Sequence, residues 1–352
     1  MRKRLLSFIL ALVLICTLLP FAAFAAGGTV YVGFTSDVHG QTGNLENWFD
    51  KLPVGSSNLQ NMGYCGDYSY SSGTSYINDF KSIVSITNEK VGNNSGVYTA
   101  GNHCYSNVDG TNSALNSAFT STTGYKRIGE AVNTDDYTIF CFGAASGDGT
   151  GSFKQDDITT LSDYLKTADK DEPIFILSHY PLHVNSWRTI GKASDVIDLL
   201  NGYPNVVFVW GHNHSQGDSQ YGTIKAAGDS INYSGSSSKT INFTYLSAGA
   251  MREGNSGSGK YYGMVAAVAT DGSGVTFTYY NLSGSNMGSK TVSLDGSPSV
   301  DPEPSVPSTG SVEITPTTDK PEVSAAVAVG DTLTLKVTNG SSSSSYTFTA
   351  TM

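Results

Sequence analysis

The segment VVFVWGHNHSQ, at positions 206–216, places five consecutive apolar residues directly before a pair of histidines. A continuous apolar run of this length predicts a strand that is buried on both faces. The chain has only six histidines, and His212 and His214 stand one residue apart at the end of this strand. Residues i and i+2 of extended backbone point to the same side, so both imidazoles can reach one site.

The same pattern recurs along most of the chain and predicts an α/β fold. Apolar strands are expected at 29–36, 61–65, 96–100, 173–178 and 205–209, with helices at 45–52, 76–90, 156–169 and 194–200. Strands that are apolar throughout are covered by helices on both faces. After position 245 the pattern changes to consecutive strands at 244–250, 261–280 and 290–294, with DGSG as a hairpin turn.

Both ends of the chain differ from this central domain, which we place at 26–295. Residues 1–25 combine a basic start, a long apolar run and the small-x-small motif AFA, which predicts a secretory signal peptide. We therefore expect a secreted or extracellular protein that contacts a membrane only during export. Residues 296–310 form a Pro/Ser-rich linker, and residues 311–352 a small all-β module. This module either docks on the central domain or is incomplete, and contact with the cell surface is a further alternative for it.

Composition excludes some partners and limits disulfide bonding. The formal net charge of −10, without a basic stripe, excludes a nucleic-acid duplex as the expected partner. After removal of the signal peptide three cysteines remain, Cys65, Cys104 and Cys141, so at most one disulfide can form within the chain. Cys65 and Cys104 are candidates for that pair, and the alternative is that they are buried thiols behind the strand ends.

Five predicted strands run directly into motifs of metal-ligand type. In chain order they are Asp37-Val38-His39, Gly66-Asp67, Gly101-Asn102-His103, His179 and Gly211-His212-Asn213-His214. Taken singly, each motif is equally typical of a turn or of a buried polar residue. Ligand sites of α/β sheets form at the carboxyl ends of strands, so the ordered combination predicts one shared site. Its O and N donors suit two divalent transition metals, with Mn, Fe or Zn expected.

This donor set also favours a class of substrate. Two metals about 3.5–4 Å apart can hold a bridging hydroxide and clamp phosphoryl oxygens. Two divalent ions, two aspartates and one hydroxide leave a charge of roughly +1, which suits a phosphate better than a neutral acyl group. Glycines beside the ligands allow the backbone to approach the site closely.

Together these motifs resemble the signature of the calcineurin-like metallophosphoesterases over residues 29–290. The resemblance implies a four-layer sandwich, in which two mixed β-sheets pack face to face between helices. It also implies a phosphoesterase in which the bridging hydroxide attacks phosphorus in line. The implied residues are Asp37, His39 and His214 for the first metal, Asn102, His179 and His212 for the second, Asp67 as the bridge, and His103 as a catalytic residue that stabilises charge and protonates the leaving oxygen.

Two positions depart from the family pattern. An acidic residue usually follows Gly-Asn-His and orients that histidine, but here Cys104 follows, so the tuning of His103 stays open. Tyr70 lies three residues after Asp67, as in the purple acid phosphatases, where such a tyrosine binds ferric iron. Those enzymes lack the histidine of Asp-x-His, and His39 is present in this chain. A purple-acid-type enzyme is therefore the alternative, and otherwise Tyr70 lies on a loop rim.

The substrate is expected to be a phosphorylated small molecule or a nucleotide, cleaved as a monoester or a diester. Specificity is expected to come from the loops at 104–136 and 215–243. Arg188 and Arg252 are candidates to bind a distal anion of the substrate. His183 is either a substrate contact or an exposed loop residue. The remaining alternative is a catalytically idle extracellular binding module that keeps the fold.

Overall fold

The chain divides into two units, Met1–Ser299 and Val300–Met352, in a computed structural model. The described residues are 28–71, 73–106, 121, 129–143, 151–184, 189–214, 220–252, 261–297, and the strands at 332–339 and 342–349. The predicted signal peptide and nearly all of the predicted linker lie outside them. Within these ranges, no helix is both long enough and apolar enough to cross a membrane.

The first sheet of the larger unit has six strands in the order β14-β13-β12-β1-β2-β3. Strands β1 (Thr29–Thr35), β2 (Leu59–Tyr64) and β3 (Gly96–Tyr98) run parallel to one another. Strands β12 (Gly263–Ala269), β13 (Val275–Tyr280) and β14 (Asn286–Val292) continue the sheet as an antiparallel meander. The carboxyl ends of the three parallel strands therefore meet at one edge of this sheet.

The second sheet also has six strands, in the order β4-β5-β6-β7-β11-β8. Its central strands β5 (Thr138–Cys141), β6 (Ile174–Ser178), β7 (Val206–Trp210) and β11 (Thr244–Ser247) are parallel. The edge strands β4 (Ala131–Asn133) and β8 (Ile224–Lys225) are antiparallel to their neighbours. Both sheets are thus mixed, and the predicted strand-end motifs follow their parallel strands.

Two segments that the sequence predicted as loops contain strands. Strand β4 lies in the segment 104–136, and β8 lies in the segment 215–243 together with the hairpin of β9 (Ser230–Asn232) and β10 (Ser238–Thr240). Strand β5 was also missed. These strands have two to four residues, which is too short for alternation to be recognised in the sequence.

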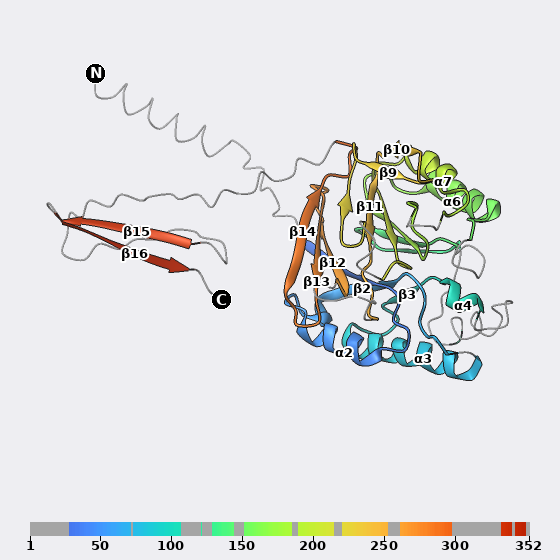
Figure 1. Ribbon diagram of the computed structural model, residues 1–352, viewed down its shortest axis with the longest axis horizontal. Helices are drawn as coiled ribbons and strands as arrows, with labels where there is room; N and C mark the ends of the chain where they lie inside the picture. The colour runs from blue at the N-terminus through green and yellow to red at the C-terminus, as the bar shows by residue number, and fades with distance from the viewer. Residues whose placement is uncertain are drawn as a thin grey trace, which may run out of the picture. The chain divides into compact units, whose positions relative to one another are not determined.

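Helices cover the outer faces of both sheets. Helices α2 (Thr42–Lys51) and α3 (Gly73–Lys90) lie below β2 and β3 in Figure 1, and α6 (Gln155–Thr167) and α7 (Ala193–Leu200) lie at the other side of the unit. Helix α6 buries Ile158, Leu161 and Leu165, the stripe that its helical spacing predicted. The short elements η1 (Ser56–Asn58) and α4 (Asn102–Ser106) precede β2 and follow β3.

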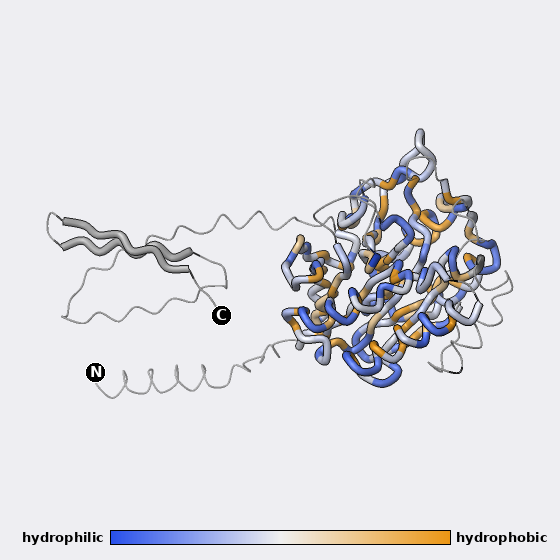
Figure 2. Tube along the Cα trace, turned by 60° about the horizontal axis from the view of Figure 1, so that its bottom comes forward, coloured by the Kyte–Doolittle hydropathy of each residue, from blue (hydrophilic) through white to orange (hydrophobic). Residues whose placement is uncertain are grey.

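The core between the sheets is formed by alternate residues of facing strands. Val32 and Phe34 of β1 belong to one buried cluster with Val207 and Val209 of β7. The other residues of β7, such as Trp210, belong to the cluster that contains the buried helix residues. Strand β7 is therefore buried on both faces, and the four-layer sandwich is confirmed. Figure 2 shows that hydrophilic and hydrophobic stretches are intermixed along the trace of the larger unit.

The smaller unit contains one described antiparallel hairpin, β15 (Thr332–Asn339) and β16 (Ser342–Thr349). It lies within the predicted β module. In the larger unit Cys65, Cys104 and Cys141 are free and buried. A Cys65–Cys104 disulfide is therefore absent, and the expectation of buried thiols is confirmed.

Candidate metal centre

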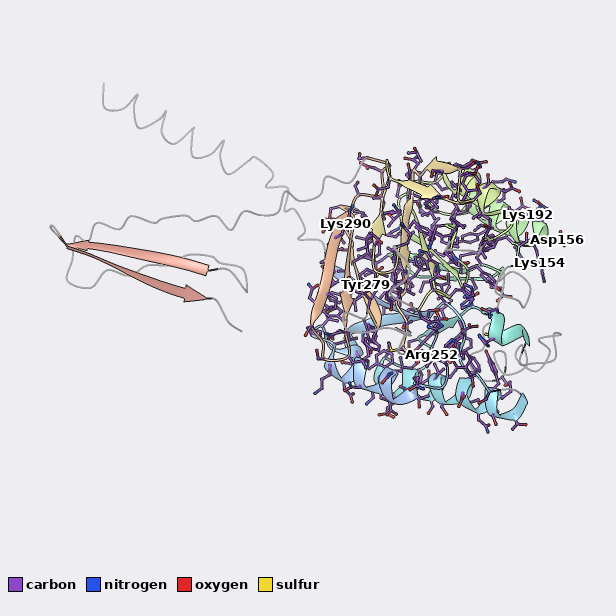
Figure 3. The ribbon with its side chains drawn as sticks, viewed as in Figure 1. Lys154, Asp156, Lys192, Arg252, Tyr279 and Lys290 are labelled. Carbon is purple, nitrogen blue, oxygen red and sulfur yellow. The ribbon has the colours of Figure 1, made fainter. Side chains whose placement is uncertain are left out.

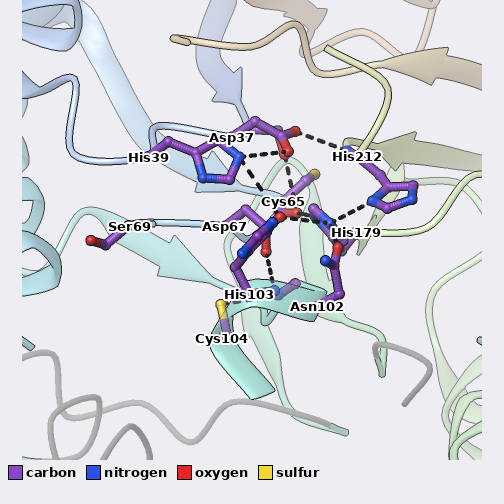
Figure 4. A network of polar contacts seen from close by, with 12 residues as sticks. Asp37, His39, Cys65, Asp67, Ser69, Asn102, His103, Cys104, His179 and His212 are labelled. Carbon is purple, nitrogen blue, oxygen red and sulfur yellow. Dashed lines mark hydrogen bonds and ion pairs between the residues drawn. The ribbon is translucent and has the colours of Figure 1, made fainter. Parts of the chain in front are cut away.

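The strand-end motifs of both sheets converge on one cluster of polar side chains (Figure 4). The first sheet contributes Asp37 after β1, Asp67 after β2 and Asn102 after β3, and the second contributes His179 after β6 and His212 after β7. The cluster contains two groups of three residues, and within each group the potential ligand atoms lie within 4.8 Å of one another. The first group is Asp37, His39 and His214, and the second group is Asp67, His179 and His212. The sequence predicted the same first group, but it assigned Asn102, His179 and His212 to the second metal and Asp67 to both metals, and these assignments stay predictions.

The backbone of this cluster is held in an uncommon conformation. Asp37, His39, Asp67 and His212 have φ angles of 47°, 49°, 55° and 70°. Residues other than glycine rarely adopt this region, at a cost of about 1–3 kcal/mol each. Hydrogen bonds between the two strand-end turns hold it, since the Asp37 N–H donates to the Gly66 carbonyl at 3.0 Å and the His39 N–H to the Asp67 carbonyl at 3.0 Å. Strain of this kind is typical of functional sites.

Glycines beside the ligands are required by close approach of the backbone. Gly66 has a φ of 95°, and a Cβ there would collide with the backbone of Gly101. A Cβ on Gly211 would collide with the Ser36 hydroxyl and lie 3.0 Å from an Asp37 carboxylate oxygen. The predicted role of these glycines is therefore confirmed.

The second group is arranged around one ring nitrogen of His179. The other nitrogen, Nδ1, lies 2.7 Å from the Cys65 carbonyl oxygen and must donate to it, because a carbonyl can only accept. Nε2 then faces Asn102 Oδ1 at 2.9 Å, His212 Nδ1 at 3.1 Å and Asp67 Oδ2 at 3.2 Å. A single proton on Nε2 cannot serve all three atoms, whereas a cation placed among them can.

Electrostatics agree with a cationic centre. Burial lowers the pKa of His179, but the Asp67 and Asp37 carboxylates and the hydrogen bond to the Cys65 carbonyl together raise the pKa to about 9. Burial likewise raises the pKa of Asp37, and the surrounding histidines His39, His179 and His214 reverse that effect and hold it below its usual value. The cluster thus keeps its carboxylates ionised and attracts positive charge.

The first group contains buried polar atoms that lack hydrogen-bond partners. These atoms are Asp37 Oδ1, both ring nitrogens of His39, and His214 Nδ1. His39 Nε2 lies 3.6 Å from Asp37 Oδ1 and 3.8 Å from Asp67 Oδ2, which is too far for a hydrogen bond. Unsatisfied buried groups cost about 1–3 kcal/mol each. A metal ion bound in this group would take one ligand atom from each residue, including Asp37 Oδ1 and one ring nitrogen of His39, so the donor set fits a metal ion.

His103, the predicted catalytic residue, lies beside both groups. Its backbone N–H donates to Asp67 Oδ1 at 2.9 Å, and its half-buried ring lies edge-on to His39 with centroids 5.1 Å apart. Burial lowers the pKa of the imidazole. Within the described ranges, no carboxylate hydrogen-bonds this ring. Cys104 does not replace one, since its sulfur accepts from the Tyr76 hydroxyl at 2.7 Å and the Gly101 N–H at 3.1 Å.

Tyr70 lies at the rim of the first group, and 41% of its surface is exposed. Its ring stacks flat on His39, with the centroids 3.7 Å apart and the planes at 9°. The guanidinium of Arg252 lies over the same ring at 4.1 Å. The sequence named Tyr70 and Arg252 separately but could not predict this contact, because it joins segments that are far apart in the chain.

His183 is buried, so it is not the exposed loop residue that the sequence allowed. Its Nδ1 lies 2.6 Å from the Tyr245 hydroxyl and its Nε2 lies 3.3 Å from the Asn213 side-chain amide. Asn213 separates the two histidines of the Gly-His-x-His motif, so His183 supports the ligand loop from behind. The apolar neighbours Tyr180 and Leu182 were the signal for burial in the sequence. Arg188 lies outside the described residues.

Comparisons with known proteins agree with this architecture. No protein-family model and no curated protein matches the sequence. A purple acid phosphatase, PPD1, from yellow lupin (Lupinus luteus) seeds is 12% identical with a TM-score of 0.50, and the match covers 76% of this chain and 54% of that one. This chain therefore spans about half the length of the lupin enzyme.

Two bacterial structures are similar over a comparable part of the chain. TT1561 of Thermus thermophilus is 10% identical, with a TM-score of 0.42 and coverage of 76% of this chain and 100% of that one. The phosphopantetheinyl hydrolase PptH of Mycobacterium tuberculosis is 16% identical, with a TM-score of 0.36 and coverage of 65% and 92%. At such identities the similarity concerns the fold alone. The larger unit has the metallophosphoesterase sandwich fold.

Proposed function

We propose that the chain is a metal-dependent phosphoesterase that binds two divalent transition-metal ions and hydrolyses phosphate monoesters or diesters. One observation carries the proposal: Asp and His side chains from four strand ends of two sheets bring buried polar atoms together, and several of these atoms have no hydrogen-bond partner. Hydrogen bonding within the protein does not account for such an arrangement, whereas bound cations would. The fold supports the same conclusion.

Each ligand has a proposed role. Asp37, His39 and His214 hold one ion, Asn102, His179 and His212 hold the other, and Asp67 lies between them. When bound, the ions supply an activated water at neutral pH and neutralise charge on the phosphoryl oxygens. The Cys65 carbonyl holds the proton of His179 on Nδ1, which leaves Nε2 as a ligand.

His103 is the proposed proton donor to the leaving oxygen. Its backbone N–H is fixed on Asp67, so its ring stays beside the reacting group. Burial lowers the pKa of its imidazole, so the protonated form is a stronger acid than an exposed histidine but is less populated at neutral pH. Cys104 holds the turn that carries His103 and takes no part in proton transfer.

A purple-acid-type phosphatase is the second candidate, favoured by the contact between Tyr70 and His39. In that case the hydroxyl of Tyr70 binds ferric iron. Concentrated iron-loaded protein would then absorb visible light through tyrosine-to-iron charge transfer, and Tyr70→Phe would remove the band. We favour the first candidate because His39 remains available as a ligand.

We also propose that residues 1–25 direct export and are removed. N-terminal sequencing of the mature protein tests this, with a new N-terminus after Ala25 as the expected result. Residues 311–352 are proposed to contact the cell surface, and binding of the mature chain to isolated cell walls, compared with a chain ending at 295, tests that role.

An activity panel tests the main proposal. Metal-loaded protein is assayed against a phosphate monoester, a phosphate diester and a nucleotide, with His103→Ala as the matched variant. We expect hydrolysis of at least one substrate and a loss of about 100-fold or more in the variant at unchanged metal content. Full metal occupancy without hydrolysis of any of the three would favour the idle binding module.

A further inference from the structure

A sixth strand end contributes a cation to the rim of the candidate metal centre. Strand β11 is parallel to β7, and residues 251 and 252 of the segment that follows it lie beside the first group. The Arg252 N–H donates to the Asp37 carbonyl at 3.0 Å, and the preceding Met251 N–H donates to the Ser36 carbonyl at 3.1 Å. The backbone of Arg252 is therefore fixed to the loop that carries two predicted ligands.

Tyr70 separates the guanidinium of Arg252 from the proposed ligands. His39 stacks on the Tyr70 ring at 3.7 Å and the guanidinium lies over it at 4.1 Å. Two groups that close to one ring centre must occupy opposite faces. Arg252 thus lies one aromatic layer further out than His39. It is placed beside the phosphoryl site and not within it.

The guanidinium has unused hydrogen-bonding capacity. Among the residues that the structure describes, Arg252 forms no ion pair and its side chain donates no hydrogen bond. The cation–π contact occupies only its face. The in-plane N–H groups of a guanidinium form a rigid fork that matches the oxygens of a phosphate. Its stacked position therefore orients a phosphate-binding group in advance.

The neighbourhood of Tyr70 indicates which part of a substrate reaches Arg252. The Tyr70 ring also contacts His103 edge-on, with centroids 4.8 Å apart. His103 is the proposed donor to the leaving oxygen, so the leaving group extends past His103 towards the exposed edge of Tyr70. Both faces of Tyr70 are covered, so the ring cannot stack on a nucleobase. At the rim formed by Tyr70 and Arg252, the group available to bind a substrate is therefore the positive charge of Arg252.

We propose that Arg252 binds a second phosphate on the leaving group, so that bisphosphorylated compounds are the preferred substrate class. This inference rests on the proposed function. Tyr70 acts as a positioning residue that holds the guanidinium in place. The scissile phosphate binds at the metal centre, so Arg252 does not raise the affinity for a substrate that has only one phosphate.

Non-hydrolysable analogues test this preference without requiring turnover. Calorimetry on the metal-loaded full chain compares propylphosphonate with propane-1,3-diphosphonate. We expect the diphosphonate to bind about tenfold more tightly, which is the effect of one charge-assisted contact. Arg252→Gln should abolish this preference and leave the affinity for propylphosphonate unchanged. Lys290→Gln, which removes a positive charge from β14, should change neither affinity (Figure 3).

The possible outcomes separate this inference from the proposed function. Equal affinities in the wild type, or a preference that survives Arg252→Gln, would overturn the role of Arg252. A uniform loss for both phosphonates would also overturn it, because Arg252 would then contact the scissile phosphate. If Arg252→Gln loses metal or folds poorly, Arg252→Lys tests the role of Arg252 instead. Lysine keeps the positive charge but lacks the planar N–H groups of the guanidinium, so it should weaken the preference for the diphosphonate without abolishing it. Hydrolysis of propyl phosphate and propane-1,3-diol bisphosphate reports on the proposed function alone.

Discussion

The two groups of proposed ligands are neighbours, but the protein supports them differently. In the second group Asp67, His179 and His212 are all buried, and the Cys65 carbonyl fixes His179 from behind. In the first group His39 makes no hydrogen bond through its ring, and His214 is half-buried. The second group is therefore preorganised by protein contacts, whereas the polar atoms of the first group depend on a metal.

The first group also faces the rim where substrate is expected to approach. Tyr70 and Arg252 lie on its outer side, and 41% of the Tyr70 surface is exposed. The comparison teaches that the second group is arranged to bind a metal ion stably, whereas the first group is arranged to give substrate access to the centre. The predictions that follow test this difference.

Asp67→Ala is expected to have the largest effect, because the Asp67 carboxylate lies between His39 of the first group and His179 of the second group. We expect metal content to fall below one ion per chain and turnover to fall by about 1000-fold or more. Atomic emission on the dialysed protein and an ester assay measure the two effects. Asp50→Ala, which breaks a surface pair with Lys90, is the matched control and should change neither. Full activity in Asp67→Ala would show that the bridging role is wrong.

His103→Ala is expected to separate chemistry from metal binding. The side chain is not a proposed ligand, so both ions should stay bound while turnover falls by about 100-fold. The same emission and assay measurements apply. Loss of metal in this variant would mean that His103 supports the centre itself and would contradict its role as a proton donor alone.

The difference in support should appear in the metal-free protein. His179→Ala removes the buried ring that hydrogen-bonds the Cys65 carbonyl, so the free energy of unfolding should fall by about 2–3 kcal/mol. His39→Ala removes a ring without hydrogen bonds and should cost less than about 1 kcal/mol. Denaturant unfolding in the presence of a chelator measures both. Equal losses would remove the distinction between the two groups.

The smallest expected effect concerns the cysteines behind the second group. Burial raises the pKa of Cys104 to about 11 and that of Cys65 well above its usual value. At pH 8 the native chain without residues 1–25 should therefore react negligibly with a thiol reagent, and removal of metal should not accelerate labelling. Fast labelling after chelation would show that the second group opens without its metal.

Much of the centre was predictable because its chemistry is local in the sequence. Each proposed ligand follows an apolar strand, as at Asp37 and His179, and parallel strands bring their ends to one edge. The short strands β4 and β8 were not predictable, since so few residues carry no periodicity. The Tyr70–Arg252 contact depends on packing between distant segments, which one sequence does not encode in a readable pattern.

The metal stoichiometry of the purified protein tests the central claim most directly. Equilibrium dialysis against Mn²⁺ or Zn²⁺, followed by atomic emission, should give two ions per chain for the wild type, with one retained in His39→Ala. A wild-type protein that binds one ion or none at neutral pH would contradict a centre built from both groups.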